Sequence, residues 1–145
     1  MQQLQFQAMK RGVLTWICAL TISLSSIHAR AHHSLSGSYE MNREITIEGV
    51  ITVFQFVNPH PFVTVSMESP REKQQWRAEL DNRSELVEIG MTIETFKPGD
   101  RVIIVGNPGH EKAQTIYVRR LNRPSDGLKY EQPDTTPSIQ IPNKR

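Results

Sequence analysis

Histidine is the residue type with the clearest chemical potential in this sequence. Two histidines, His32 and His33, are neighbours and follow directly after Ala31. If the chain is exported and cleaved after Ala31, His32 becomes the first residue and carries a free α-amine beside its imidazole. His60 lies between two prolines in the segment Asn58-Pro59-His60-Pro61. Amine and imidazole nitrogens are donors that Cu(II) and Zn(II) accept, so the sequence predicts a transition-metal site.

The predicted metal site combines the start of the mature chain with two residues further along. In this hypothesis His32 chelates through its amine and its ring, and His33 or His60 supplies the next nitrogen. The prolines on either side of His60 hold that residue in place, which lowers the entropy lost on binding. Glu79 serves as a carboxylate ligand or as the acceptor that orients an imidazole N–H. Both roles require the segment after Ala31 to fold back onto the rest of the protein.

The histidines also allow a purely structural interpretation. A His-His pair at a flexible terminus can remain solvated, and His60 can bond only the backbone of its own turn. His110 follows Asn107-Pro108-Gly109 and is expected to be solvated. Catalysis has little support, because Ser34 lacks an acid partner and the chain contains neither a G-x-S-x-G motif nor a phosphate-binding glycine loop. We therefore expect no catalytic residues and no enzyme activity.

Residues 1–31 are typical of a secretory signal peptide. A basic pair precedes an apolar run over residues 13–27, and Ala29-Arg30-Ala31 fits the small-x-small pattern of signal peptidase. The run is about 15 residues long and a membrane helix needs about 20, so we expect cleavage near Ala31 and no membrane span in the mature protein. Cys18 leaves with this segment, which excludes a disulfide or a thiolate ligand. The expected location is periplasmic or secreted.

The charge of the mature chain differs from that of the precursor. The whole chain has 17 Lys+Arg and 15 Asp+Glu residues, and loss of Lys10, Arg11 and Arg30 leaves 14 basic residues against 15 acidic ones. A protein that binds nucleic acid through its phosphates needs a concentrated basic excess, so a nucleic-acid partner is not expected. One local cluster is predicted to be a solvated strand edge and not an anion site: Arg119, Arg120 and Arg123.

Apolar and polar residues alternate with the period of β-strands through most of the mature chain. Strands are predicted near residues 44–57, 62–68, 74–80, 101–106 and 113–121. Gly49 interrupts the alternation of the first strand, where a bulge or sharp bend is easiest. Asn82 and Glu85 predict the start of a short helix, which Gly90 can end. Five strands with a helix between the third and fourth predict a small antiparallel OB-like barrel, with an open antiparallel sandwich as the alternative.

The domain organisation follows from these elements. Residues 1–31 are the predicted signal peptide, and residues 32–122 form the predicted β-barrel domain with a short N-terminal leader. Residues 123–145 contain four prolines and few apolar side chains. Burial of so few apolar side chains does not offset the conformational entropy lost on ordering. This segment is therefore predicted to be a disordered tail, with a partner-binding strand as the alternative.

Four short motifs occur in a fixed order along the predicted domain. They are His32-His33-Ser34, Asn58-Pro59-His60, Trp76 with Glu79 three residues on, and Lys97-Pro98-Gly99-Asp100. Together, over about residues 32–122, they resemble the bacterial secreted family known as domain of unknown function 6152. Phe62 and Met91 stand where the family pattern has tryptophan. The resemblance implies a small exported β-barrel and assigns no activity.

Three functions from different classes are compatible with this sequence. The first is a periplasmic metal-binding protein, for copper or zinc, that sequesters or delivers the ion. The second is a non-enzymatic module that binds a glycan, a peptide or a small ligand on the barrel face. Its stacking residues would be Trp76, Phe54, Phe56 and Tyr117. The third is an envelope protein whose protein partner takes residues 123–145. Converging histidine nitrogens would favour the first function, and a ring of exposed aromatic side chains would favour the second.

Overall fold

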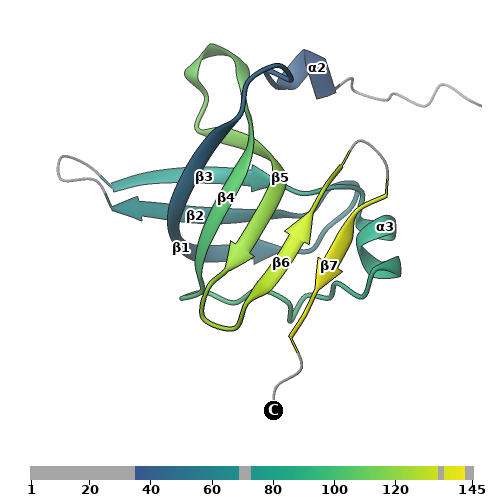
Figure 1. The fold of residues 1–145 in the computed structure, drawn as a ribbon. Helices are drawn as coiled ribbons and strands as arrows, with labels where there is room; N and C mark the ends of the chain where they lie inside the picture. The colour runs from purple at the N-terminus through teal and green to yellow at the C-terminus, as the bar shows by residue number, and fades with distance from the viewer. Residues whose placement is uncertain (1–34, 69–72, 134–135, 143–145) are drawn as a thin grey trace, which may run out of the picture. The chain divides into compact units, whose positions relative to one another are not determined.

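The computed structural model describes residues 35–68, 73–133 and 136–142. In this part of the chain the strands are β1 (Ile45–Gln55), β2 (Phe62–Glu68), β3 (Lys73–Glu79), β4 (Arg101–Pro108), β5 (Thr115–Arg123), β6 (Leu128–Glu131) and β7 (Ser138–Gln140) (Figure 1). Two short α-helices, α2 (Leu35–Ser38) and α3 (Arg83–Glu88), and a 3-10 turn, η1 (His110–Lys112), connect them. The strands form one sheet in the order β3-β2-β1-β4-β5-β6-β7.

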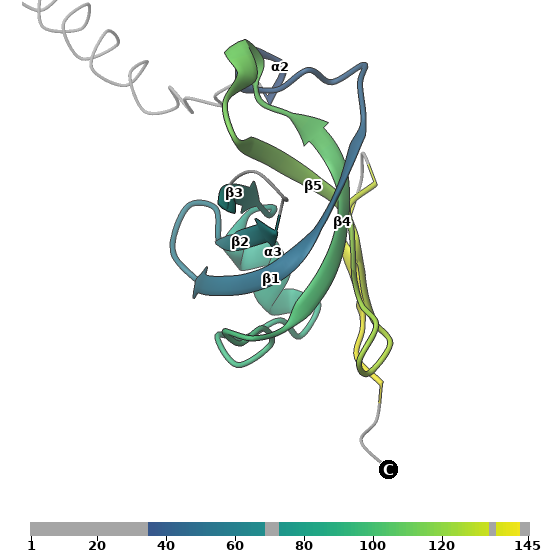
Figure 2. The ribbon, with the colours of Figure 1, turned by 90° about the vertical axis from the view of Figure 1, so that its left-hand side faces the viewer.

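A parallel pairing between β3 and β5 closes the first five strands into a barrel. Residues 77–79 of β3 lie beside residues 115–117 of β5, while the other neighbouring strands are antiparallel. Figure 2 shows the hairpin of β6 and β7, in yellow, continuing the sheet past this barrel. The closed order β1-β2-β3-β5-β4 with α3 between β3 and β4 is that of the OB fold. The predicted five-stranded barrel is confirmed.

The core is built by the alternation that the sequence displays. Alternate residues are buried over most of the strands, β5 buries three consecutive residues at 116–118, and α3 adds Leu86. Full burial of one such aliphatic side chain stabilises the fold by about 1.5–3 kcal/mol relative to exposure. The buried aliphatic residues of the barrel strands are Ile47, Ile51, Val63, Val65, Ala78, Val102, Ile104, Ile116, Val118 and Leu121.

The irregularity in β1 lies after the position expected from the sequence. The register of β1 against β2 shifts between Ile51 and Val53, and not at Gly49. Gly49 is instead needed for a close approach, because a Cβ at this position would overlap the carbonyl oxygen of Ser66 on β2. The glycine therefore lets two strands coil tightly around each other, while the extra residue is accommodated further along β1.

The prediction of a disordered tail over residues 123–145 is wrong for the described part of that segment. β6 pairs antiparallel with the second half of β5, and β7 pairs with β6. Leu128 and Tyr130 of β6 are fully buried, and the Tyr130 hydroxyl donates a hydrogen bond to Gln132 Oε1 over 3.2 Å. The segment has few apolar residues, but β5 offers it a free edge beyond the barrel. A protein partner for this segment stays an untested prediction.

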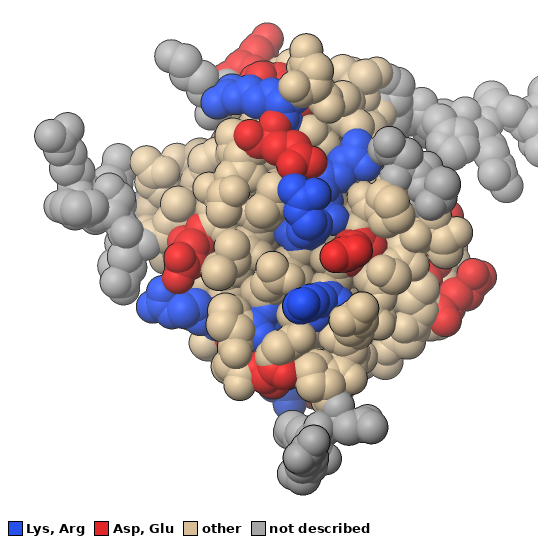
Figure 3. Space-filling model, in the orientation of Figure 1, with Lys and Arg blue, Asp and Glu red and all other residues tan. Residues whose placement is uncertain are grey.

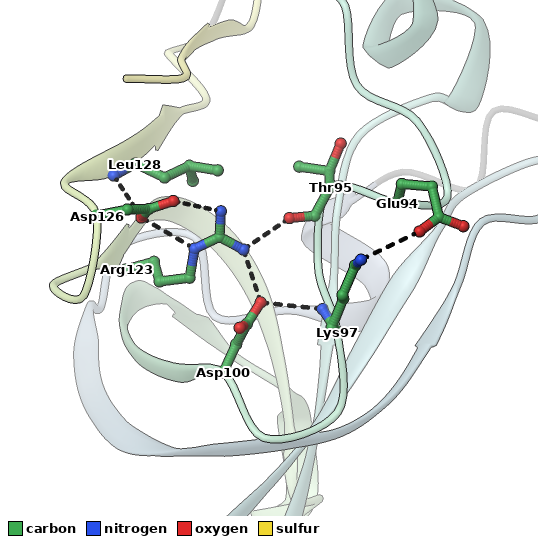
Figure 4. Close-up of polar contacts among 7 residues, drawn as sticks. All are labelled: Glu94, Thr95, Lys97, Asp100, Arg123, Asp126 and Leu128. Atoms are coloured by element: carbon green, nitrogen blue, oxygen red, sulfur yellow. Dashed lines mark hydrogen bonds and ion pairs between the residues drawn. The ribbon is translucent and has the colours of Figure 1, made fainter. Parts of the chain in front are cut away.

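Arg123 corrects the prediction of a solvated arginine cluster. Only 13% of its side chain is exposed, and its guanidinium contacts the β3–β4 connection and the β5–β6 turn (Figure 4). It donates to Asp100 Oδ2 over 2.6 Å, to the Thr95 carbonyl over 2.7 Å and to both carboxylate oxygens of Asp126. Arg120 is exposed, as predicted, but it lies on the face of β5 between β4 and β6 and pairs with Glu44. The Arg123 side chain thus ties two distant loops together.

Arg123→Met is expected to lower the free energy of unfolding by about 2–3 kcal/mol at pH 7, because it leaves the half-buried Asp100 without its cation. Arg123 also lowers the pKa of Asp126 through its hydrogen bonds. A carboxylate whose pKa is lowered in the folded state stabilises the fold at pH values above its unfolded pKa, and this stabilisation disappears as the pH falls. In urea unfolding, the difference in free energy of unfolding between the parent chain and Arg123→Met should therefore shrink below about pH 4. Arg101→Met, which breaks a more exposed pair with Glu48, is the control and should change stability by less than about 0.5 kcal/mol.

Candidate functional site

The structure brings together two of the four predicted metal-site residues. The Nδ1 atom of His60, in the β1–β2 turn, lies 2.6 Å from Oε1 of Glu79, the last residue of β3. A carboxylate oxygen accepts, so Nδ1 carries the proton, and in the neutral ring the lone pair is then on Nε2. The Nε2 atom has no hydrogen-bond partner among the described residues. With 34% of the His60 side chain exposed, this atom is available to a ligand.

Backbone hydrogen bonds hold the turn that carries His60 from both sides. The Pro59 carbonyl accepts from the N–H of Arg83, and the Pro61 carbonyl accepts from the N–H of Leu80, both over 2.9 Å. Both donors belong to the segment that follows Glu79, so the turn and the carboxylate are parts of one local structure. The proline rings restrict the same backbone. His60 is therefore oriented before anything binds to it.

The leader packs on the barrel through Tyr39, which the sequence analysis did not select. The Tyr39 hydroxyl donates to Oε2 of Glu79 over 2.6 Å, so one carboxylate orients both the phenol and the His60 ring. The Tyr39 ring contacts that of Tyr117 at 5.7 Å between centroids, and its backbone forms a bridge with Gly109. Burial, together with the bond to Glu79, raises the pKa of Tyr39. The phenol thus stays protonated and keeps donating at physiological pH.

Further contacts fix the rest of the described leader. The Glu40 N–H donates to the Pro108 carbonyl over 2.8 Å, and the buried Asn107 amide donates to three backbone carbonyls of residues 40–43. His110 is exposed, and its Nε2 lies 3.1 Å from the Ser36 carbonyl. His110 is therefore at the surface, as predicted, and in addition contacts the backbone of the leader. The leader is held at both the β4–β5 connection and the end of β3.

His32 and His33 lie outside the described residues. Within the described part of the chain, no group of three or more His, Cys, Asp or Glu side chains is arranged to hold a metal ion. His60 and Glu79 therefore form a pair, and a metal site at this pair needs donors from another segment. The structure establishes the imidazole–carboxylate contact and the docking of the leader beside it.

Two carboxylates lie near His60. Besides Glu79, Glu85 of α3 is close enough for its charge to interact with His60, and Asp81 lies close to Glu85. Burial and then the proximity of Asp81 raise the pKa of Glu85, whereas the charge of His60 acts in the opposite direction. These carboxylates contribute a negative potential, whereas Arg77, whose charge acts on Tyr39, and Arg83, which bonds the Phe56 carbonyl, add positive charge nearby. The His60–Glu79 pair therefore lies among charges of both signs.

The aromatic residues proposed for ligand stacking do not form an exposed surface. Tyr117 is buried beneath Tyr39, and Trp76 packs against the core. Phe54 contacts the rings of Phe56 and Phe96, at centroid distances of 5.7 and 5.3 Å. None of the four proposed stacking residues is exposed. Their physical role is to fill the barrel and its rim.

The comparison with protein families finds a match. A protein-family model described as a family of unknown function (DUF6152) matches residues 20–117, which include β1 to β4, the first part of β5 and all four predicted metal-site residues. No curated protein matches the chain. Among the described residues, no helix has the length and apolar character needed to cross a membrane.

Proposed function

The chain belongs to the DUF6152 family, whose function is unknown, and we propose that it is an exported, non-catalytic protein that binds Cu(II) or Zn(II) between its mature N-terminus and His60. One observation carries this proposal: the His60 ring is fixed through Nδ1 by Glu79, while Nε2 has no partner among the described residues. Metal-binding histidines in proteins commonly donate their second ring N–H to a carboxylate in this way.

The docked leader supports the participation of the N-terminus. His32 lies three residues before Leu35, where α2 begins, and three extended residues span at most about 11 Å. The Tyr39 hydroxyl and the His60 ring contact the two oxygens of one carboxylate. The proposal requires these three residues to bring the amine and ring of His32, or the ring of His33, from the start of α2 to Nε2 of His60.

The donor set favours Cu(II) over other ions. An α-amine and two or three imidazoles form a nitrogen-rich set without thiolates, which suits the tetragonal geometry of Cu(II), with Zn(II) as the alternative. The carboxylates of Asp81 and Glu85 add a negative potential near the same imidazole. The proposed role is sequestration or delivery of the ion in the periplasm, with no chemical step at the protein.

Addition of one alanine before His32 in the mature chain is expected to weaken Cu(II) binding at least tenfold, because the α-amine then moves away from the His32 imidazole. Affinity is measured by competition with a chromophoric chelator of known affinity. Thermal unfolding of the apoprotein should be the same for both chains, which separates a lost ligand from a damaged fold. Equal Cu(II) affinity of the two chains would show that the amine is not a ligand.

A further inference from the structure

A second site is suggested by a hollow on the outer face of β5 and β6. The cavity has a volume of about 550 Å³ and is bordered by the turn before β1, through Met41 and Glu44. On the face of the sheet seen in Figure 1, basic and acidic side chains are interspersed and no single-sign patch forms (Figure 3). The cavity shares no residue with the His60–Glu79 pair. Most of its wall comes from residues after Tyr117, beyond the family match.

Charges of both signs line the cavity. Among the described residues of its wall, two are arginines, Arg119 and Arg120, and two are glutamates, Glu44 and Glu131. Arg120 donates to Glu44 over 2.7 Å and lies opposite Glu131 in the register of β5 and β6. Glu131 has no ion-pair or hydrogen-bond partner for its carboxylate among the described residues. A polyanion or polycation would be repelled by half of this wall, whereas a molecule that carries both charges is not.

Gln132 supplies an unused donor in the same wall. It is only 7% exposed, and its Oε1 accepts the hydrogen bond of Tyr130. Its side-chain amide N–H groups have no partner among the described residues. The Gln132 amide nitrogen is not among the fully buried atoms that lack a partner in the described residues, so a bound molecule can reach it. An acceptor of a bound molecule would provide that partner.

We propose that this cavity binds a small zwitterion of the amino-acid or short-peptide class. The carboxylate of the ligand accepts hydrogen bonds from the Arg120 guanidinium and the Gln132 amide N–H groups, and its ammonium group donates to the carboxylates of Glu131 and Glu44. The volume lies within the range of about 300–1,000 Å³ typical of small-molecule sites. Because the site uses none of the metal-site residues, it stands or falls independently of the proposed metal binding.

The test is an NMR titration of the mature chain with the dipeptide L-alanyl-L-alanine as the probe. The backbone amide signals of Glu44, Arg120 and Gln132 should shift with saturation. The N-acetylated peptide lacks the ammonium charge and the C-terminally amidated peptide lacks the carboxylate, so each should bind at least tenfold more weakly. Saturable shifts that are equal for all three peptides, or shifts confined to other parts of the barrel, would overturn the proposal, as would no shift at all.

Two surface variants identify the charges involved. Arg120→Gln and Glu131→Gln should each weaken dialanine binding about tenfold, since each removes one charged partner of the ligand. Arg101→Gln is the matched control, because it breaks a similar exposed ion pair, with Glu48, outside the cavity. This control should bind the peptide as the parent chain does. Unchanged affinity in both Arg120→Gln and Glu131→Gln would show that the peptide binds elsewhere.

Discussion

Deletion of residues 124–145 should lower the free energy of unfolding by at least about 5 kcal/mol, because it removes two fully buried side chains, Leu128 and Tyr130, together with β6 and β7. A loss of this size approaches the whole stability of a small domain, about 5–15 kcal/mol. Urea unfolding followed by the fluorescence of Trp76, the only tryptophan after residue 31, measures the effect. A disordered tail would instead be removable without any change of the unfolding midpoint.

Point variants separate packing from chain length in this prediction. Tyr130→Ala should account for about 3–5 kcal/mol, and Tyr130→Phe for about 1 kcal/mol through loss of the hydrogen bond to Gln132. Lys129→Ala changes an exposed neighbour on the same strand and should alter stability by less than about 0.5 kcal/mol. If Tyr130→Ala is as mild as Lys129→Ala, then β6 does not belong to the core.

His60→Ala is expected to weaken Cu(II) binding to the mature chain about 100-fold, because it removes the one fixed imidazole of the proposed site. Glu79→Gln keeps the ring and removes only the charged acceptor of Nδ1, so its expected effect is about tenfold. Both affinities are measured by the same chelator competition at one pH. The expected Cu(II) affinity is therefore highest for the parent chain, lower for Glu79→Gln and lowest for His60→Ala.

His110→Ala is the matched control for this series. His110 also contacts the leader, through the Ser36 carbonyl, but it is exposed and has no carboxylate to orient it. Its loss should change Cu(II) affinity by less than about threefold. If His110→Ala has the larger effect and His60→Ala none, the barrel contributes its ligand from the β4–β5 connection, and the proposed site is wrong.

The barrel was predictable because its strands alternate apolar and polar residues over seven or more positions. β2 has the bounds that were predicted, and the Asn82 side chain caps α3 by accepting the N–H of Ser84. β6 was missed because only two of its side chains, Leu128 and Tyr130, are buried. Two apolar residues among prolines carry too weak a periodic signal, and the strand is stabilised by pairing with an edge that no local pattern describes.

The site was predictable only in part for a similar reason. Glu79 was selected as an acceptor for an imidazole, and the structure places it against His60. Tyr39 was missed, because its contact with Glu79 joins residues forty positions apart and a single aromatic residue in a polar leader has no periodicity. Glu79 is paired with Tyr117 between the parallel strands β3 and β5. A leader that packs on Tyr117 therefore lies close to the Glu79 carboxylate, which can be inferred only after the strands are assigned.

Binding of the metal at Nε2 of His60 can be observed by NMR on the mature chain with ¹⁵N-labelled histidine. Without metal, His60 should show the tautomer protonated at Nδ1, as its bond to Glu79 requires. One equivalent of Zn(II) should then shift its Nε2 resonance together with those of His32, and leave His110 unchanged. If His32 and His33 respond while His60 does not, the metal is held by the terminus alone and the barrel has no part in the site.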